Sequence, residues 1–380
     1  MPVGPALVSR AGRPEDFSLT LQLLHTLARS PDTTLAYEEV SDYEQVLDRI
    51  DEEVIHTYPY WRLRGLGPEE FRSCRPEATA SGQPWVSEQF WSAVQRWVAA
   101  LGDAHTAVIG PGVRRPPYRA LMTDGGARLL SVPEGSAAYT AGVREGWTVD
   151  CGDPGHWLST VGASPQHHAQ VAARRFLEMT TPRRRFTARS PEGEQVSWTE
   201  APQQPEPFVI TEGPLIAISR FDGETPELFR EALQTRPGEP EITVDLRGNA
   251  GGSLVAADQC RRMLLRETGV YGSLRYSDGC CGLSEPYPLR VEATDAGFCG
   301  QLRVLVDEMT YSAAEDFLQP LVGLDWVRLE GGPTGGGAGR PRTIPLMEGY
   351  TLRSAVPSPT QQPGTPSTST GSGEVEPEVR

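Results

Sequence analysis

The chain has 380 residues, of which 38% are hydrophobic and 22% charged, so it is long enough for two or three folded domains and is typical of a globular protein. Its formal net charge of −15 argues against a nucleic-acid partner and against anionic membrane surfaces, because both attract basic proteins. The same acidity gives a small bias toward neutral or cationic substrates.

The six cysteines show no metal-ligand spacing, and the adjacent pair Cys280–Cys281 is not a C-x-x-C motif. We therefore expect reduced cysteines, no bound metal and no cofactor. The N-terminus lacks a charged segment followed by an apolar core, and no apolar run reaches membrane length. A cytoplasmic protein that does not bind a membrane is the expectation; the oligomeric state is left open.

Residues 1–112 are predicted to form an N-terminal helical domain. Apolar residues recur at helical spacing in three segments, 17–27, 43–58 and 88–101. Ser87 is the expected N-cap of the third helix, which leads through His105 into a short apolar run. A histidine at a helix-to-strand junction usually has no special role, so its position alone does not make His105 catalytic.

Residues 113–202 are predicted to form a second, β-rich domain. Turns separate the strand expected over 128–132, the short helix over 137–141 and the strand over 147–150. The order V-P-E-G-S-A-A-Y-T-A-G-V-R-E-G-W resembles the middle of a PDZ domain. Such domains typically hold an extended chain end by adding it as a strand to a sheet edge.

Residues 203–355 alternate strands and helices and are predicted to form the catalytic α/β core of a multi-domain α/β protein. The expected strands are 215–218, 242–244 and 304–306, and the expected helices are 225–233, 254–265 and 313–318. This alternation favours βαβ units around a largely parallel sheet, with functional loops at the carboxyl ends of the strands. Residues 356–380 are predicted to be a Pro/Ser/Thr-rich tail.

Ser312 lies at one of these strand-to-helix turns. A hydroxyl there can stand clear of the backbone, and the first N–H groups of the helix point toward whatever it attacks. The same residues also read S-x-x-E, a capping box in which the serine only satisfies a free N–H of the helix. From this stretch alone the capping interpretation is favoured.

Two glycine-rich loops lie near it in the predicted sheet. The loop 245–253 contains G-N-A-G-G, whose glycines either expose backbone N–H donors for an oxyanion hole or simply permit positive φ and close packing. The run 331–339 is either the flexible border of an active site or only a loop.

Taken in order, L-G-D-A-H-T, the PDZ-like segment, V-D-L-R-G-N-A-G-G, T-Y-S-A-A-E and G-G-P-T-G-G-G resemble the S41 serine peptidase family. That family includes the C-terminal processing proteases, the tricorn protease core and the interphotoreceptor retinoid-binding protein modules. The resemblance implies a catalytic core of the ClpP/crotonase-like type with Ser312 as nucleophile. It also implies an oxyanion hole made by backbone N–H groups of Ala313 and of Gly251 or Gly252.

The family uses two kinds of general base. In C-terminal processing proteases the base is a lysine of a glycine-flanked loop, but the corresponding place in this chain is Gly337 and the loop 331–339 has no lysine. The tricorn-like branch instead has a histidine in an L-x-D-x-H-T setting, which His105 matches. A neutral imidazole can take the proton of a hydroxyl, so we predict that Ser312 and His105 lie within hydrogen-bond reach. The glycines expected to border the substrate are Gly335, Gly336 and Gly337.

The acid that would orient the base is less evident. Tricorn-like relatives have a glutamate near the C-terminus, whose place here falls around 370–371, and Asp103 and Glu348 are the candidate substitutes. A missing orienting acid would lower activity by a large factor. The expected function is hydrolysis of a peptide or a small amide or ester through an acyl-enzyme. The alternative is a non-catalytic ligand- or peptide-binding protein that retains the fold.

Overall fold

The computed structural model divides the chain into two compact units, Met1–Val40 and Ser41–Arg380. It describes residues 40–77, 86–112, 115–201, 209–236, 238–276, 285–294, 298–337, 340–356 and 359–362. The helix predicted over 17–27 lies outside the described residues. All elements described below belong to the second unit.

Four helices begin this unit: α2 (Tyr43–Thr57), α3 (Trp61–Arg64), α4 (Pro68–Ser73) and α5 (Ser87–Ala99). In α2 the predicted apolar stripe is fully buried, and the side chain of Asp42 caps the helix by accepting from the N–H of Gln45. The predicted cap of α5 is wrong, because the helix already begins at Ser87 and Val86 occupies the N-cap position.

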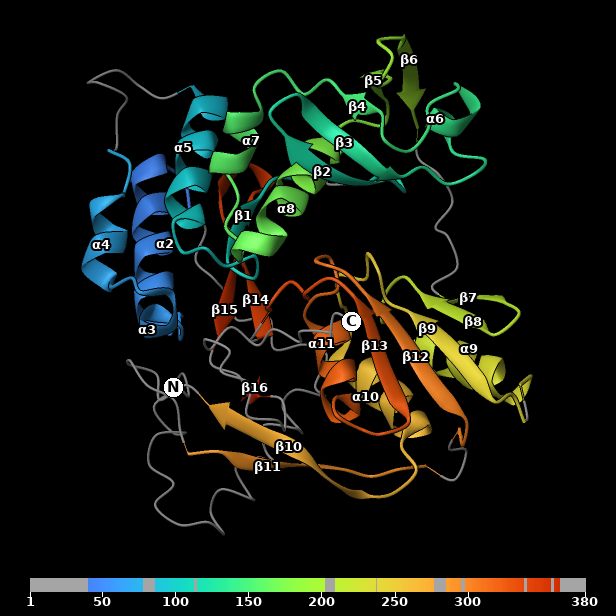
Figure 1. The fold of residues 1–380 in the computed structure, drawn as a ribbon. Coiled ribbons are helices and arrows are strands. Elements are labelled where there is room, and N and C mark those ends of the chain that lie inside the picture. The colour runs from blue at the N-terminus through green and yellow to red at the C-terminus, as the bar shows by residue number, and fades with distance from the viewer. Residues whose placement is uncertain are drawn as a thin grey trace. The chain divides into compact units, whose positions relative to one another are not determined.

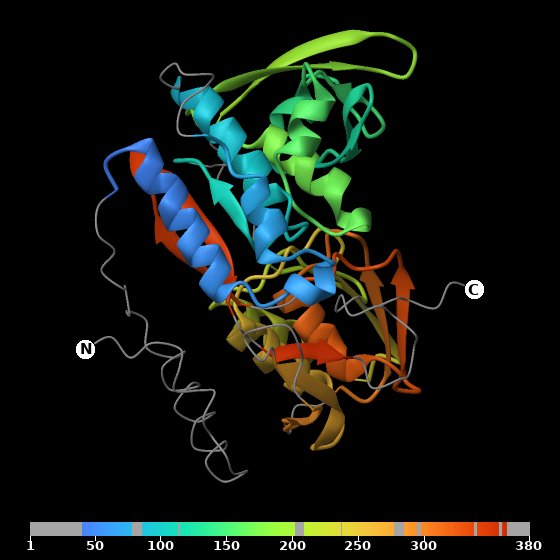
Figure 2. The same ribbon diagram turned by 90° about the vertical axis from the view of Figure 1, so that its left-hand side faces the viewer.

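A three-stranded antiparallel sheet joins this helical segment to the end of the chain. β1 (Ala107–Ile109) pairs with β15 (Thr351–Val356), which pairs with β14 (Arg340–Pro345). Figure 2 shows α2 lying along these strands. The predicted boundary after residue 112 therefore separates β1 from strands with which it forms a sheet. Local sequence patterns could not show this, because the paired strands are more than 200 residues apart in the sequence.

A five-stranded antiparallel sheet in the order β2-β3-β4-β5-β6 follows. Its strands are β2 (Arg119–Thr123), β3 (Gly126–Ser131), β4 (Thr148–Val149), β5 (Arg184–Arg189) and β6 (Gln195–Glu200). The helices of this segment are α6 (Ala137–Thr140), α7 (Pro154–Ser159) and α8 (Pro165–Leu177). They share an apolar core with the sheet, so residues 115–201 have a core of their own.

The second five-stranded sheet has the order β13-β12-β9-β8-β7, and only β7 is antiparallel to its neighbour. Its strands are β7 (Val209–Glu212), β8 (Leu215–Ile218), β9 (Glu241–Asp245), β12 (Gln301–Val306) and β13 (Val327–Gly331). The helices α9 (Thr225–Gln234), α10 (Leu254–Leu264), α11 (Ala313–Leu318) and the 3-10 turn η2 (Gln319–Leu321) pack against it around one core (Figure 1). The predicted largely parallel sheet is confirmed.

The last sheet has the order β11-β10-β16, formed by β10 (Gly269–Tyr276), β11 (Tyr287–Val291) and β16 (Pro359–Gln362). The predicted tail 356–380 therefore contains a strand that pairs with β10. A 3-10 turn, η3 (Met347–Gly349), separates β14 from β15.

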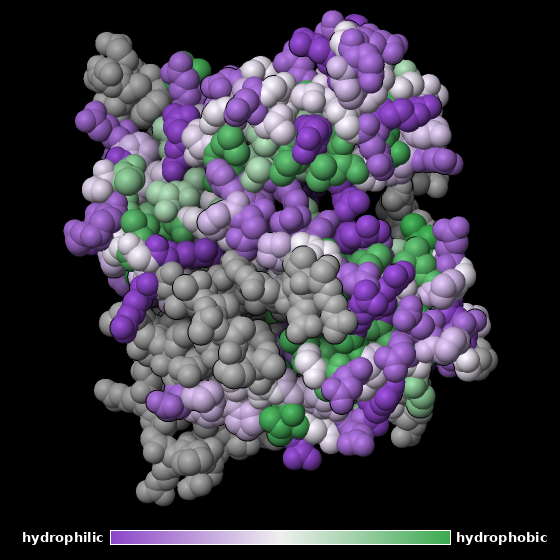
Figure 3. Space-filling view, viewed as in Figure 1, coloured by the Kyte–Doolittle hydropathy of each residue, from purple (hydrophilic) through white to green (hydrophobic). Residues whose placement is uncertain are grey.

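On the face shown in Figure 3 the described residues are mostly hydrophilic, and the apolar ones lie in separate groups. None of the described helices is long and apolar enough to cross a membrane. Among the described residues, no group of three His, Cys, Asp or Glu side chains is placed to hold a metal ion.

Candidate active site

Ser312 sits in a strained turn between β12 and α11. Its φ of 59° and ψ of −119° lie in a region that residues other than glycine rarely adopt, and such strain costs on the order of 1–3 kcal/mol. The Ser312 Oγ lies 3.0 Å from Nε2 of His105, 207 residues earlier in the chain. This distance agrees with the predicted hydrogen-bond reach. The hydroxyl therefore faces the imidazole. The predicted capping box of Ser312 and Glu315 is also present at the start of α11.

The carboxylate of Glu315 holds this turn in place. Its Oε2 accepts from the N–H of Ser312 at 2.8 Å and from the N–H of Gly337 at 2.7 Å. Its Oε1 accepts from the Thr334 hydroxyl at 2.6 Å and from the N–H of Gly336 at 2.8 Å. Burial raises the pKa of Glu315 to about 7, although the four hydrogen bonds act in the opposite direction. One buried side chain thus ties the nucleophile turn to the glycine loop after β13.

The glycine-rich turn after β9 packs directly against the nucleophile turn. The backbone carbonyl of Asn249 accepts from the N–H of Tyr311, and the Asn249 side chain donates to the carbonyl of Ile218 on β8. Gly251 has a φ of 93°, and a Cβ there would lie 2.7 Å from the carbonyl oxygen of Tyr311 and 2.9 Å from Cβ of Ser312. Only glycine fits this contact, which confirms that packing requires a glycine here.

Asp307, the residue after β12, links the nucleophile turn to the glycine-rich turn after β9. Its Oδ1 accepts backbone N–H groups of Gly248, Met309 and Thr310 at 2.9–3.1 Å. Its Oδ2 accepts from Arg119 of β2 at 2.8 Å. The same carboxylate therefore joins the turns after β9 and β12 to the β2–β6 sheet.

His105 is positioned through its backbone and through a tilted ring contact with Tyr311. The buried Asp103 carboxylate accepts from the N–H of His105 at 2.9 Å and from the hydroxyl of Thr106 at 3.0 Å. Tyr311 lies between two imidazoles, with ring centroids 4.7 Å from His105 and 4.7 Å from His167 of α8. Burial lowers the pKa of His167 to about 4, so this ring is neutral at pH 7.

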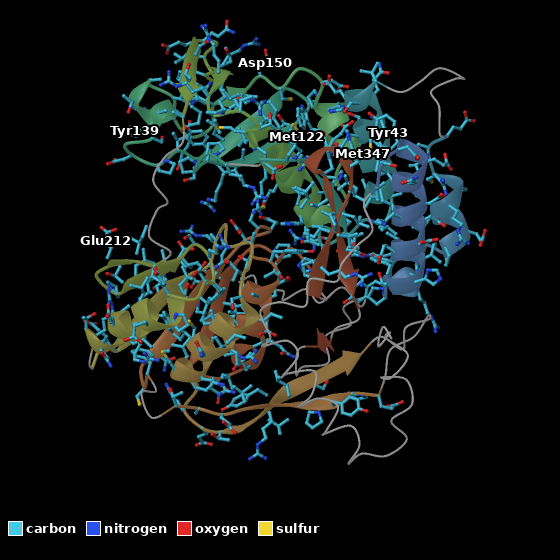
Figure 4. The ribbon with its side chains drawn as sticks, turned by 180° about the vertical axis from the view of Figure 1, so that it is seen from behind. Tyr43, Met122, Tyr139, Asp150, Glu212 and Met347 are labelled. Atoms are coloured by element: carbon cyan, nitrogen blue, oxygen red, sulfur yellow. The ribbon has the colours of Figure 1, made fainter. Side chains whose placement is uncertain are left out.

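The two candidate orienting acids have other partners. The contacts of Asp103 place the main chain of His105 and not its ring. Glu348 accepts from Ser87 at 2.5 Å, from Trp91 Nε1 at 2.8 Å and from Tyr43 at 3.1 Å, and these bonds, that from Ser87 first, lower its pKa. Figure 4 shows Tyr43 beside Met347, the neighbour of Glu348. Glu348 therefore stabilises the contact between the helical segment and η3.

The backbone donors predicted for an oxyanion hole differ in availability. The N–H of Gly251 donates to Oδ1 of Asn249 at 2.8 Å, so it is already used. Ala313 is the first residue of α11, where a helix provides no acceptor for an N–H. Gly252 has a φ of 135°, and a Cβ there would overlap the carbonyl oxygen of Phe221. Of the two glycines, Gly252 keeps the freer N–H among the described residues.

The loop glycines predicted to border a substrate also have other partners. The N–H groups of Gly336 and Gly337 both bind Glu315. Cβ atoms at Gly335 and Gly337 would lie 2.7 Å and 2.5 Å from the ring of Tyr311. Gly335 and Gly337 have no room for a side chain because the loop packs against the ring of Tyr311. That these glycines border the substrate stays a prediction.

Several residues of the site were missed from the sequence. The capping-box motif predicts that the carboxylate of Glu315 accepts from the N–H of Ser312. It does not predict the three other groups that donate to this carboxylate. Helix α8, which carries His167, could have been found from Ser164 at its N-cap and Pro165 at its first position. All 35 basic residues are arginines, so the sequence has no lysine and excludes a lysine base anywhere in the chain.

Comparison with known protein families gives one match. The model of peptidase family S41 matches residues 214–379. No curated protein matches the sequence. The match confirms the predicted resemblance to this family and supports serine peptidase activity.

Several solved structures have a similar fold. The photosystem II D1 C-terminal processing protease is 17% identical, with 90% of this chain and 93% of that chain covered and a TM-score of 0.55. Mature CPAF is 16% identical, with 88% and 92% covered and a TM-score of 0.63. A putative peptidase from Parabacteroides merdae is 13% identical, with 89% of each chain covered and a TM-score of 0.50. At these identities the likeness shows a mixed α/β fold shared with S41 proteases.

Proposed function

We propose that the chain, whose residues 214–379 match the model of peptidase family S41, hydrolyses a peptide, or a small amide or ester, through an acyl-enzyme on Ser312. The observation that carries the proposal is the 3.0 Å approach of His105 Nε2 to Oγ of a serine held at positive φ. A strained turn persists only where the surrounding structure holds it, and such turns cluster at active sites.

In this reaction the neutral His105 takes the proton of Ser312 through Nε2 while Oγ attacks the substrate carbonyl. The N–H groups of Ala313 and Gly252 stabilise the oxyanion that forms. The protonated imidazole then gives its proton to the leaving amine or alcohol. Water attacks the acyl-enzyme with His105 again as base, which regenerates the Ser312 hydroxyl.

The finer architecture is part of the proposal. We assign residues 113–202 as a PDZ-like domain, which is supported by the β2–β6 sheet with α8 and by the sequence motif in this segment. The parallel sheet is assigned to the ClpP/crotonase-like type. A PDZ-like domain would hold an extended chain end at a sheet edge, which fits a peptide substrate.

Mass spectrometry of a peptide library incubated with the wild type and with Ser312→Ala tests the activity. The proposal predicts new peptide termini with the wild type only. Identical spectra for the two proteins, both folded, would instead favour a peptide-binding protein that retains the fold without the chemistry.

A further inference from the structure

Helix α8 presents a polar face toward the nucleophile turn. His167, Gln170 and Arg174 recur at the spacing of one helix face. His167 Nδ1 donates to the backbone carbonyl of Glu308, and Gln170 Nε2 donates to its carboxylate at 3.0 Å. Arg174 lies one turn further along this face and is half-buried.

Arg353 approaches the same place from the other side. It lies directly opposite Ala107 in the β1–β15 pair, and Ala107 follows His105 by two residues. Arg175, the neighbour of Arg174, donates to the carbonyl of Val108 at 3.3 Å, so the end of α8 lies over the same strand. The two half-buried guanidinium groups lie close to each other. Arg174 lies near His167, and Arg353 lies near Tyr311, whose ring contacts that of His105.

Neither group has an acceptor within the described part of the chain. The Nε of Arg353 is buried without a hydrogen-bond partner, and neither Arg174 nor Arg353 forms an ion pair there. The two nearby acids have other hydrogen-bond partners. Glu178, near Arg174, binds Arg115 at 2.9 Å and Arg175 at 2.8 Å. Asp103, near Arg353, accepts from the N–H of His105 and the hydroxyl of Thr106. Burial and the neighbouring Arg115 lower the pKa of Arg174 to about 9, which leaves the group charged at neutral pH.

Burying a cation without an ion-pair partner costs free energy, and a ligand of opposite charge that binds to the cation offsets this cost. We propose that Arg174 and Arg353 bind a carboxylate of the substrate beside Ser312 and His105. The proposal rests on the proposed function and narrows its substrate class. A guanidinium matches a planar carboxylate with two parallel hydrogen bonds. This local charge opposes the bias of the whole chain, whose net charge is −15.

The carboxylate is either the C-terminus of the peptide or an acidic side chain, and matched peptides distinguish the two. One pair differs only in a free or amidated C-terminus, and a second pair has Asp or Asn near the cleaved bond. We expect the wild type to prefer one carboxylate peptide over its neutral partner by about 10- to 100-fold in kcat/KM, through KM. The pair that shows the preference identifies the source.

In Arg174→Gln and Arg353→Gln the ratio of kcat/KM for the carboxylate peptide to kcat/KM for its neutral partner should fall toward one. Arg230→Gln is the matched control, because Arg230 forms an exposed pair with Glu227 on α9, and it should keep the ratio. Both test variants should melt no lower than the wild type, since an unpaired cation is removed. Equal cleavage of both members of each pair by the wild type would overturn the proposal, as would an unchanged ratio in both test variants.

Binding to Ser312→Ala separates this proposal from the activity itself. Fluorescent carboxylate and amide peptides are titrated with this variant, alone and combined with Arg353→Gln. Tighter binding of the carboxylate peptide that is lost with Arg353 supports the subsite even if no peptide is hydrolysed. Equal affinity for the two peptides overturns it even if the wild type is active.

Discussion

Replacing Glu315 by glutamine tests how the nucleophile turn is held. The carboxylate accepts four hydrogen bonds, and a carboxamide has one oxygen and one NH₂ group in the same place. The NH₂ should face Thr334, whose hydroxyl can rotate and accept. Only the N–H of Gly336 then loses its acceptor, which costs about 1–3 kcal/mol, while Ser312 keeps its bond.

The charge of Glu315 gives the test a clear sign. Burial raises its pKa from 4.5 in the unfolded chain to about 7, so the folded protein binds the proton more tightly. Its contribution to stability is therefore fully present below pH 4.5 and is lost as the pH rises to about 7. At about 1.4 kcal/mol per tenfold change in proton affinity, the loss amounts to about 3 kcal/mol. Glutamine does not titrate and removes this dependence.

Urea unfolding of the wild type and Glu315→Gln between pH 5 and pH 8 measures the effect. Glu212→Gln is the control, because Glu212 is an exposed residue of β7 (Figure 4). The free energy of unfolding of the wild type minus that of Glu315→Gln should fall as the pH rises to 7 and be constant above it. The difference between variants is needed because the buried His167 gives the wild type an opposite dependence.

The opposite trend would refute this reasoning. A wild-type advantage that grows from pH 5 to pH 7 would mean that the four hydrogen bonds hold the carboxylate ionised more strongly than burial opposes it. A difference independent of pH would mean that Glu315 does not titrate in this range in the folded protein.

Three further changes test the site. Ser312→Gly should be about 1 kcal/mol more stable than Ser312→Ala, because glycine relieves the positive φ; equal urea midpoints would contradict the strain. Burial lowers the pKa of His167 from 6.5 to about 4, so its contribution to stability is lost as the pH falls through this range. Between pH 6.5 and pH 4 the free energy of unfolding of the wild type should therefore fall by about 3 kcal/mol more than that of His167→Asn, and parallel curves would refute this. Gly251→Ala should lower kcat at least 100-fold, because its Cβ would lie 2.9 Å from Cβ of Ser312, and normal turnover would show that the contact relaxes freely.

Much of the parallel sheet follows from local pattern. The strand over 215–218 matches β8, and the helix over 254–265 differs from α10 by one residue. Apolar runs and helical spacing suffice there because each element buries its own apolar face. The proximity of Ser312 and His105 did not come from periodicity but from the order of the family motifs.

The rest of the site depends on contacts that local patterns do not encode. Asp307 follows an apolar strand like many acids, and only the fold brings Gly248 and Arg119 to it. The sequence shows a glycine at position 252 but not whether the protein needs its N–H group or its lack of a Cβ. The structure shows that Phe221 excludes any side chain there, so Gly252→Ala cannot serve as a neutral control for loss of the N–H.

The central claim is that His105 activates Ser312 as a nucleophile. Labelling with a fluorophosphonate probe, followed by intact-mass analysis and peptide mapping, tests it most directly. We expect one adduct per chain, located on Ser312, and labelling slowed by at least about 100-fold in His105→Gln. No adduct on the folded wild type, an adduct on another residue, or an unchanged rate in His105→Gln would contradict it.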